Sequence, residues 1–186
     1  MDPLQKEKRY TYADYAGWDD DKRYELIDGV AYMMSPAPSR QHQEVLVEMI
    51  WQIRSFLEGK PCKVYAAPFD VRLNAAGDAE DTVVQPDIVI VCDKSKLDKK
   101  GCNGTPDMVV EILSPSTASR DRLVKFNKYL EAGIKEYWIV DTETKSVQAC
   151  ILEKGRYVVS MYSDTDTAPV QVLEGCRIDL KDVFAE

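Results

Sequence analysis

The stretch VVQPDIVIV, residues 83–91, decides how this chain is interpreted, together with PDMVVEILS at 106–114. Both are nearly continuous apolar runs, which are typical of strands covered on both faces in the middle of a sheet. Asp87 stands at the head of the first run, and Glu111 lies inside the second. Carboxylates are among the residues least often buried, so the two acids either reach solvent at strand ends or converge on a common partner.

Size and composition favour one ordinary globular domain. A chain of 186 residues, with a hydrophobic fraction of 45% and a charged fraction of 30%, can bury a core without metal or disulfide staples. We therefore expect a single domain over residues 1–186, with 1–9 as a candidate flexible tail. The amino-terminal stretch lacks the apolar segment of a signal peptide, and no stretch approaches the roughly 20 apolar residues of a membrane span. This predicts a cytoplasmic protein with no membrane contact.

The charge argues against an overall basic surface, and the cysteine content argues against a disulfide framework or a thiolate zinc site. The formal net charge of −8 leaves no overall basic surface for nucleic acid, so such contact needs a local patch. The candidate patch is the loop DKSKLDKKG at 93–101, and a solvated polar loop is the alternative. The five cysteines form an odd set without a CxxC pair, which argues against a disulfide framework and a thiolate zinc site. We expect them to be reduced, mostly core thiols.

The order of the expected elements predicts an α/β fold built on a mixed sheet. Turn residues, apolar spacing and helix-ending glycines mark each element. In chain order these are a hairpin over Arg23–Met34 turning at Asp28-Gly29, a helix over Ser39–Leu57, strands over Lys63–Leu73, Val83–Val91 and Asp107–Leu113, a helix over Ser119–Ala132, a strand over Glu136–Val140, a hairpin over Ser146–Tyr162, and a short strand near Arg177-Ile178.

The two strand acids could face each other if their strands are antiparallel neighbours. The start of one strand then lies beside the end of the next. Two close carboxylates repel unless a cation or a proton lies between them. Oxygen ligands alone suit Mg²⁺, Mn²⁺ or Ca²⁺ rather than zinc. Asp87 and Glu111 are therefore candidate metal ligands, with solvated strand acids as the alternative.

Glu25, in a predicted strand, and His42, in a predicted helix, are two further polar residues of interest. Strand alternation places the side chain of Glu25 on the face of the strand opposite to that of Leu26. Taken alone, this predicts an exposed glutamate. His42 is the only histidine of the chain and lines up with the inward face at the first turn of its helix. A helix start disfavours the imidazolium, which favours a neutral ring. A capped, half-buried histidine without a function is the alternative.

Lys125 is the candidate cation. With Leu123 as the centre of the apolar face of the second helix, a step of about 100° per residue places Lys125 beside Tyr129, at the border of the sheet. A surface ion pair with Asp121, one turn earlier, is the plain alternative. A lysine directed at the sheet would instead complete a site of two or three carboxylates and one cation.

This pattern resembles the PD-(D/E)xK restriction-endonuclease-like superfamily and, more closely, the bacterial Uma-two family of predicted endonucleases. The resemblance covers nearly all of the chain from about Tyr10 onward. It is carried by YELIDGVAY, SRQHQEVLVEMI, QPDIVIV, VVEILSPST, DRLVKFNKYLEAGIKEYWIVD and IDLKDVF. The fold that it implies is a restriction-endonuclease-like mixed β-sheet flanked by α-helices, with additional β-hairpins.

The resemblance also implies site residues. Asp87 and Glu111, with the carbonyl of Ile112, would hold Mg²⁺, for which Mn²⁺ can substitute. The lysine position of the E-x-K motif is Leu113 here, and in the family that lysine is thought to have moved to the following helix, which points to Lys125.

Further implications concern supporting residues and partners. Glu25 and His42 match recurrent positions of the family, and Glu25 would hold a second metal or orient water. The SPST segment at 114–117 would receive a phosphate oxygen. DNA is the implied substrate, and a homodimer pairing edge strands of the 146–162 hairpin is the implied assembly.

Two alternatives remain open at the level of the sequence. One is a non-catalytic module that keeps the nuclease fold for binding nucleic acid or a partner, and the other is a metal-dependent phosphohydrolase of small substrates. A basic patch over 94–100 beside the Asp87–Glu111 end of the sheet would favour the nuclease, and an acidic rim would favour the alternatives.

Overall fold

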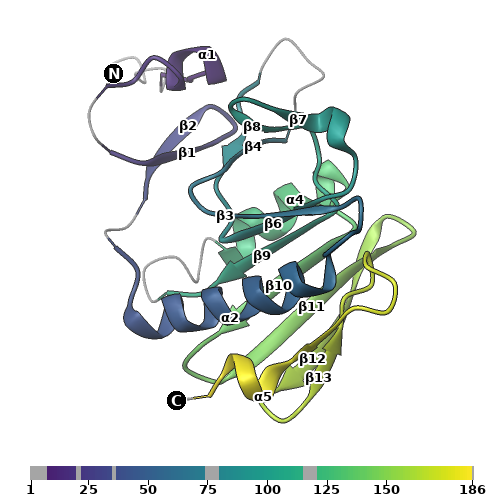
Figure 1. The fold of residues 1–186 in the computed structure, drawn as a ribbon. Helices are drawn as coiled ribbons and strands as arrows, with labels where there is room; N and C mark the ends of the chain where they lie inside the picture. Colours follow the sequence, from purple (N-terminus) through teal and green to yellow (C-terminus); the bar gives the residue numbers. More distant parts are fainter. Residues whose placement is uncertain (1–7, 20–21, 35–36, 74–79, 115–120, 186) are drawn as a thin grey trace.

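Two six-stranded sheets form the body of the molecule (Figure 1). The computed structural model describes residues 8–19, 22–34, 37–73, 80–114 and 121–185. The main sheet contains, in spatial order, β12 (Arg156–Ser163), β11 (Ser146–Glu153), β10 (Glu136–Asp141), β9 (Met108–Ile112), β6 (Ile88–Val91) and β3 (Lys63–Ala66). The second sheet contains β2 (Val30–Met33), β1 (Tyr24–Ile27), β5 (Val83–Val84), β4 (Asp70–Arg72), β8 (Gly101–Asn103) and β7 (Leu97–Asp98).

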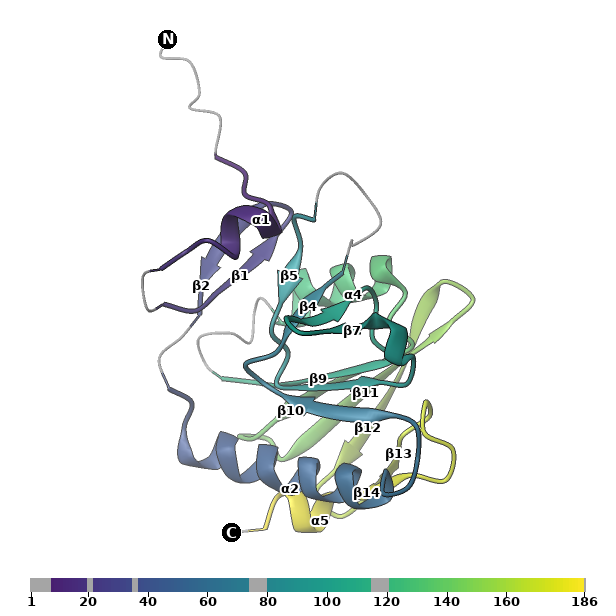
Figure 2. The ribbon, with the colours of Figure 1, turned by 45° about the horizontal axis from the view of Figure 1, so that its top comes forward.

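Helices cover both faces of the main sheet. The long helix α2 (Arg40–Phe56) lies on one face, while α4 (Phe126–Ala132) and the second sheet lie on the other (Figure 2). Smaller elements complete the described chain: α1 (Tyr12–Tyr15), the 3₁₀ turn η1 (Lys94–Lys96), the π-helical turn η2 (Asp121–Lys125), the strand pair β13 (Thr167–Pro169) and β14 (Arg177–Asp179), and α5 (Leu180–Val183).

The main sheet is mixed, as predicted. β9 and β10 run parallel, whereas β6 pairs antiparallel with β9. The apolar residues of β6, β9 and β10 are buried on both faces, in two separate core clusters. Near-continuous apolar runs in the middle of a sheet are therefore explained by cover on both sides.

The first hairpin and the first helix confirm the sequence prediction. Asp28 and Gly29 both have positive φ, which a two-residue turn between twisted strands requires, and β1 and β2 pair antiparallel around them. Ser39 caps α2 by accepting a hydrogen bond from the backbone N–H of His42, at 3.2 Å. The second hairpin, which turns at Lys154-Gly155, is also confirmed by the pairing of β11 with β12.

Two runs predicted as single strands are each divided between the two sheets, so that prediction is wrong. The 63–73 run becomes β3 and β4, and the 83–91 run becomes β5 and β6. A proline stands at each break, at Pro68 and Pro86. Proline has no N–H for the ladder and is excluded from central strands, so the chain leaves one sheet and joins the other at these points.

The second helix begins differently from its prediction. Residues 121–125 form a π-helical turn, and regular α-helix starts only at Phe126 and ends at Gly133 in the left-handed conformation. The predicted start at Ser119 and most of the SPST segment lie outside the described residues.

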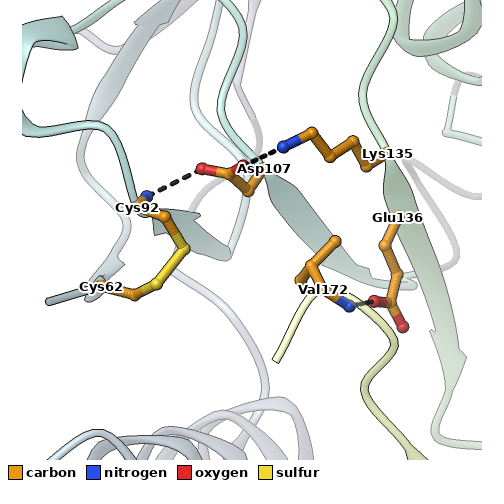
Figure 3. Close-up of a disulfide and its surroundings, with 6 residues drawn as sticks. All are labelled: Cys62, Cys92, Asp107, Lys135, Glu136 and Val172. Atoms are coloured by element: carbon orange, nitrogen blue, oxygen red, sulfur yellow. Dashed lines mark hydrogen bonds and ion pairs between the residues drawn. A yellow bond between two sulfur atoms is a disulfide. The ribbon is translucent and has the colours of Figure 1, made fainter. Parts of the chain in front are cut away.

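Cys62 and Cys92 form a disulfide, so the expectation of five reduced thiols is wrong for this pair (Figure 3). Cys62 precedes β3 and Cys92 follows β6, and the antiparallel pairing of these strands brings the two residues together. Their separation along the chain conceals this proximity in the sequence. The backbone N–H of Cys92 also donates to Asp107, which pairs with Lys135 at 2.7 Å. The remaining cysteines are buried free thiols at positions 102, 150 and 176.

Across the described ranges, no helix is both long and apolar enough to span a membrane.

Candidate active site

Three charged side chains from separate elements meet between the two sheets. Lys125 Nζ lies 2.8 Å from Glu25 Oε1 and 2.8 Å from Glu111 Oε1. The exposed fractions of these residues are 3%, 2% and 4%, respectively. We call Glu25, Glu111 and Lys125 the charge cluster. A buried carboxylate pair is stable only with a compensating cation, and Lys125 supplies it.

Neighbouring polar groups hold the charge cluster in place. Glu111 Oε1 accepts a hydrogen bond from Tyr129 Oη at 2.6 Å, and Glu25 Oε1 accepts one from the backbone N–H of Gln85 at 2.9 Å. Burial, reinforced by the charges of Glu111 and Glu25, raises the pKa of Tyr129 well above its ordinary value. Tyr129 therefore remains a hydrogen-bond donor at every physiological pH.

The structure corrects two expectations about these residues. Leu123 is 65% exposed, so it is not the centre of an inward face; Lys125 and Tyr129 face inward instead. The 100° step does not hold through the π-helical turn, which winds more residues into each turn. Glu25 is buried rather than exposed, because β1 is covered on both faces.

A second group of predicted residues lies at the head of β6. Asp87 comes immediately before β6, and continuing the antiparallel register that pairs Ile88 with Val110 brings its backbone opposite Glu111. Asp87 Oδ2 accepts a hydrogen bond from the backbone N–H of Ile112 at 2.8 Å and lies 3.4 Å from His42 Nε2. The sequence-predicted residues thus form two neighbouring sets: Asp87 with His42 and Ile112, and the charge cluster.

His42 is more basic than the sequence suggests. Burial acts to lower the pKa of its imidazole, but the hydrogen bond and the charge of Asp87 outweigh burial, and the backbone of Ile112 adds a smaller effect in the same direction. The net result is a pKa above the ordinary value of 6.5. The expectation of a neutral ring considered only the helix start and overlooked this carboxylate partner.

The donor chemistry at this position suits a hard divalent cation. Within the described ranges, no group of three or more His, Cys, Asp or Glu side chains is arranged to hold a metal ion. Mg²⁺ does not require such a group, because it keeps several waters and is usually bound through one or two carboxylates. The carboxylates of Asp87 and Glu111 and the carbonyl of Ile112 are all oxygen donors, which is the ligand type that Mg²⁺ takes.

A groove of about 320 Å³ lies over the face of the main sheet that carries Glu111. Glu111 is paired with Ile139, and Ile139 with Gln148, so the three residues form a row across β9, β10 and β11. Ile139 and Gln148 form the floor of the groove, and η2 and α4 contribute Leu123, Phe126 and Asn127.

The lysine loop at 93–101 does not border this site. Asp87 precedes the first residue of β6, whereas the loop follows the last, Val91. The loop lysines therefore lie beyond the opposite end of that strand. One of them, Lys96, donates to the carbonyl of Thr105 at 2.8 Å, which fixes it within the loop region.

Sequence reasoning missed Gln85, which joins the site to the second sheet. Its side chain accepts hydrogen bonds from Arg23 and donates to Tyr15 and Asp70, while its backbone N–H holds Glu25. Gln85 is a buried polar residue inside an apolar run. The same signal, a polar residue inside an apolar run, singled out Glu111 and could have singled out Gln85.

Most of this chain is similar in sequence to known proteins. Residues 11–181 match the model of the Uma2 family, whose description is "Putative restriction endonuclease". An uncharacterized protein of Synechocystis sp., slr1290, is 26% identical over 158 residues, which are 82% of this chain and 80% of that protein.

A solved structure shares the fold. It is described as the crystal structure of "a putative nuclease belonging to DUF820" from Anabaena variabilis, and its TM-score is 0.75. The match covers 94% of this chain and 97% of that one at 17% sequence identity. The restriction-endonuclease-like mixed α/β fold predicted from the sequence is thereby confirmed. Because the family model spans almost the whole chain, this protein belongs to the Uma2 family of restriction-endonuclease-like proteins.

Proposed function

We propose that the protein is a Mg²⁺-dependent endonuclease that hydrolyses phosphodiester bonds in DNA. The observation that carries this proposal is the charge cluster, in which a buried lysine is held against Glu111 of β9, the strand that pairs with β6. Asp87 stands immediately before β6. Membership of a family whose description is "Putative restriction endonuclease" supports the reaction class. The likeness to the Anabaena protein, described as "a putative nuclease", supports it at the level of the fold.

Asp87, Glu111 and the carbonyl of Ile112 would hold the metal. When bound there, Mg²⁺ would lower the pKa of a coordinated water and neutralise charge on the scissile phosphate. Lys125 would stabilise negative charge that develops on the phosphate in the transition state. Glu25 would fix the position of Lys125 through their ion pair. His42 and the Ile112 amide would orient Asp87.

Cleavage of supercoiled and linear DNA with Mg²⁺ or Mn²⁺ tests this function. The wild-type protein and Lys128→Met should cut, whereas Asp87→Asn and Lys125→Met should lose activity. Lys128 is a suitable control because it lies on the same helix but pairs with Asp28 and Glu131 outside the cluster. Full activity of either site variant would remove that residue from the mechanism.

Calorimetric titration of Mn²⁺ separates metal binding from cleavage. Binding to the wild type that disappears in both Asp87→Asn and Glu111→Gln would support a shared metal. If no binding occurs, even with DNA present, the proposed metal site is wrong.

A non-catalytic module that binds nucleic acid or a partner is the second candidate. The net charge of −8 and the position of the lysine loop at the far end of β6 favour it. DNA binding that persists without cleavage, under all metal conditions tested, would support this alternative. We retain the homodimer as a proposal that rests on the edge strand β12.

A further inference from the structure

The groove over the main sheet has a neutral lining. The described residues that line it are three apolar side chains and two carboxamides: Leu123, Phe126, Asn127, Ile139 and Gln148. None of these five is charged. The charge cluster lies on the same face of the sheet, where Glu111 is the strand neighbour of Ile139. A recess with neutral walls therefore stands beside a site in which every member is charged.

The groove begins one strand away from the charge cluster. Adjacent strands lie about 4.8 Å apart, so Ile139 is about 5 Å and Gln148 about 10 Å from Glu111 across the sheet. On the helical side, Lys125 immediately precedes Phe126 along the chain. In a nucleotide, a single sugar joins the phosphate to its base. One nucleotide can therefore place its phosphate at the charge cluster and its base in the groove.

We propose that the groove receives an unpaired nucleobase and that it favours adenine. This inference rests on the proposed function and deepens it, because it names the part of the substrate that is held beside the reacting phosphate. A base has two apolar faces and an edge of hydrogen-bonding groups. The apolar walls of the groove contact the faces, and the two carboxamides offer donors and acceptors to the edge. A carboxamide matches the N6 amino group and N7 of adenine together.

The two carboxamides are available to a ligand. Among the described residues, the Asn127 side chain has no hydrogen-bond partner. Gln148 is half-buried, and its Nε2 donates to Cys150 Sγ at 3.5 Å. Sulfur is a weak acceptor, so the fold gains little from a polar group at this position. The stability of the fold does not account for the Gln148 carboxamide, whereas a bound base does.

The apolar walls are positioned before a ligand binds. Phe126 packs edge-on against Tyr157, with ring centroids 5.2 Å apart and ring planes at 69°. Tyr157 Oη in turn donates to the carbonyl of Ile134 at 2.9 Å. Leu123 is 65% exposed, and covering its apolar surface with a base is favourable. A site that is already in place loses less free energy on binding than one that must be ordered.

The base that enters the groove must be unpaired. Inside a duplex the faces of a base are stacked, so a protein that holds a whole base uses single-stranded DNA or extrudes the base. The chain also lacks the overall positive charge with which proteins hold a duplex by its phosphates. Its net charge is −8, and the lysine loop lies beyond the far end of β6. The favoured substrate is therefore DNA with an unpaired segment.

Binding of oligonucleotides in EDTA tests the base site separately from cleavage. The wild type should bind a thymine strand with one central adenine about tenfold more tightly than the all-thymine strand of equal length. Gln148→Leu should remove this preference at every salt concentration, because base contacts release no counterions. Gln171→Leu is the control, since Gln171 is exposed between β13 and β14. Asn127→Ala, at an exposed helix position, should reduce the preference without disturbing the sheet.

Nuclear magnetic resonance locates the bound base. Deoxyadenosine monophosphate should shift the methyl signals of Leu123 and Ile139 and the carboxamide signals of Gln148, whereas deoxyribose 5-phosphate, which lacks the base, should not. The inference is overturned if these signals stay fixed with the nucleotide, or if folded Gln148→Leu keeps the adenine preference. Cleavage of DNA without these shifts would refute the base site and leave the proposed function standing. Shifts without cleavage, under all metal conditions tested, would do the reverse.

Discussion

Replacement of Lys125 by methionine should be strongly destabilising, because Lys125 compensates two buried carboxylates. Methionine fills a similar volume but leaves Glu25 and Glu111 without the cation that lies 2.8 Å from each. Removing one partner of a buried ion pair costs about 3–5 kcal/mol. Two carboxylates lose their cation, but each keeps a hydrogen bond, from Tyr129 or from the Gln85 amide. We therefore expect the free energy of unfolding to fall by an amount within this range rather than by twice that amount. For a chain of this length the loss lowers the melting temperature by roughly 6–20 °C.

Urea denaturation at neutral pH measures this loss. Adding Glu25→Gln and Glu111→Gln to Lys125→Met should restore most of the lost stability. Lys128→Met, whose ion pairs are partly exposed, should cost about 0–1 kcal/mol. If Lys125→Met lowers the free energy of unfolding by no more than this control does, water reaches the charge cluster and the reasoning is refuted.

Three further predictions address the neighbouring residues. Asp87→Asn should abolish metal-dependent cleavage while changing the melting temperature by only a few degrees, because the amide oxygen can still accept the hydrogen bond from Ile112; a fully active variant would contradict the assignment. The resonance of His42, the only histidine, should titrate above pH 6.5 in the wild type and at a lower pH in Asp87→Asn, where only the weaker backbone hydrogen bonds oppose burial. A raised pKa stabilises the fold at pH values below the unfolded pKa, and this stability is lost as pH rises through the folded pKa. The stability of the wild type relative to the variant should therefore increase toward low pH, and an unchanged titration would exclude the ion pair. Replacing Cys62 and Cys92 by alanine should lower the free energy of unfolding by about 3–4 kcal/mol through the lost loop constraint, as measured by urea denaturation, and two free thiols at these positions in the native protein would show that the bond does not form.

Much of the fold could be predicted from local patterns. The Asp28-Gly29 turn, the Ser39 cap and the near-continuous apolar runs each have one dominant physical cause that acts over a few residues. The division of two runs at Pro68 and Pro86 required knowledge of where a second sheet lies, and no local pattern contains that information.

The candidate site could be predicted only in part. Asp87 and Glu111 stand out because carboxylates interrupt apolar runs, and Lys125 was singled out beside them. The burial of Glu25 depends on cover from both sides of its strand, which strand alternation does not reveal. The inward direction of Lys125 depends on a π-helical turn, whose winding differs from the periodicity used to read helices.

The charge cluster draws its members from widely separated parts of the chain: a hairpin near the amino terminus, a central strand and the helix that follows it. A chain still being synthesised lacks Lys125 opposite Glu25 until at least 100 further residues have followed Glu25 and both sheets have docked. Under the proposed function, a nascent or locally opened molecule therefore carries the strand acids without the complete charge set. Hydrolysis of DNA would then be restricted to fully folded molecules, so hydrogen exchange at the β1 amides should report the fraction of protein able to cut.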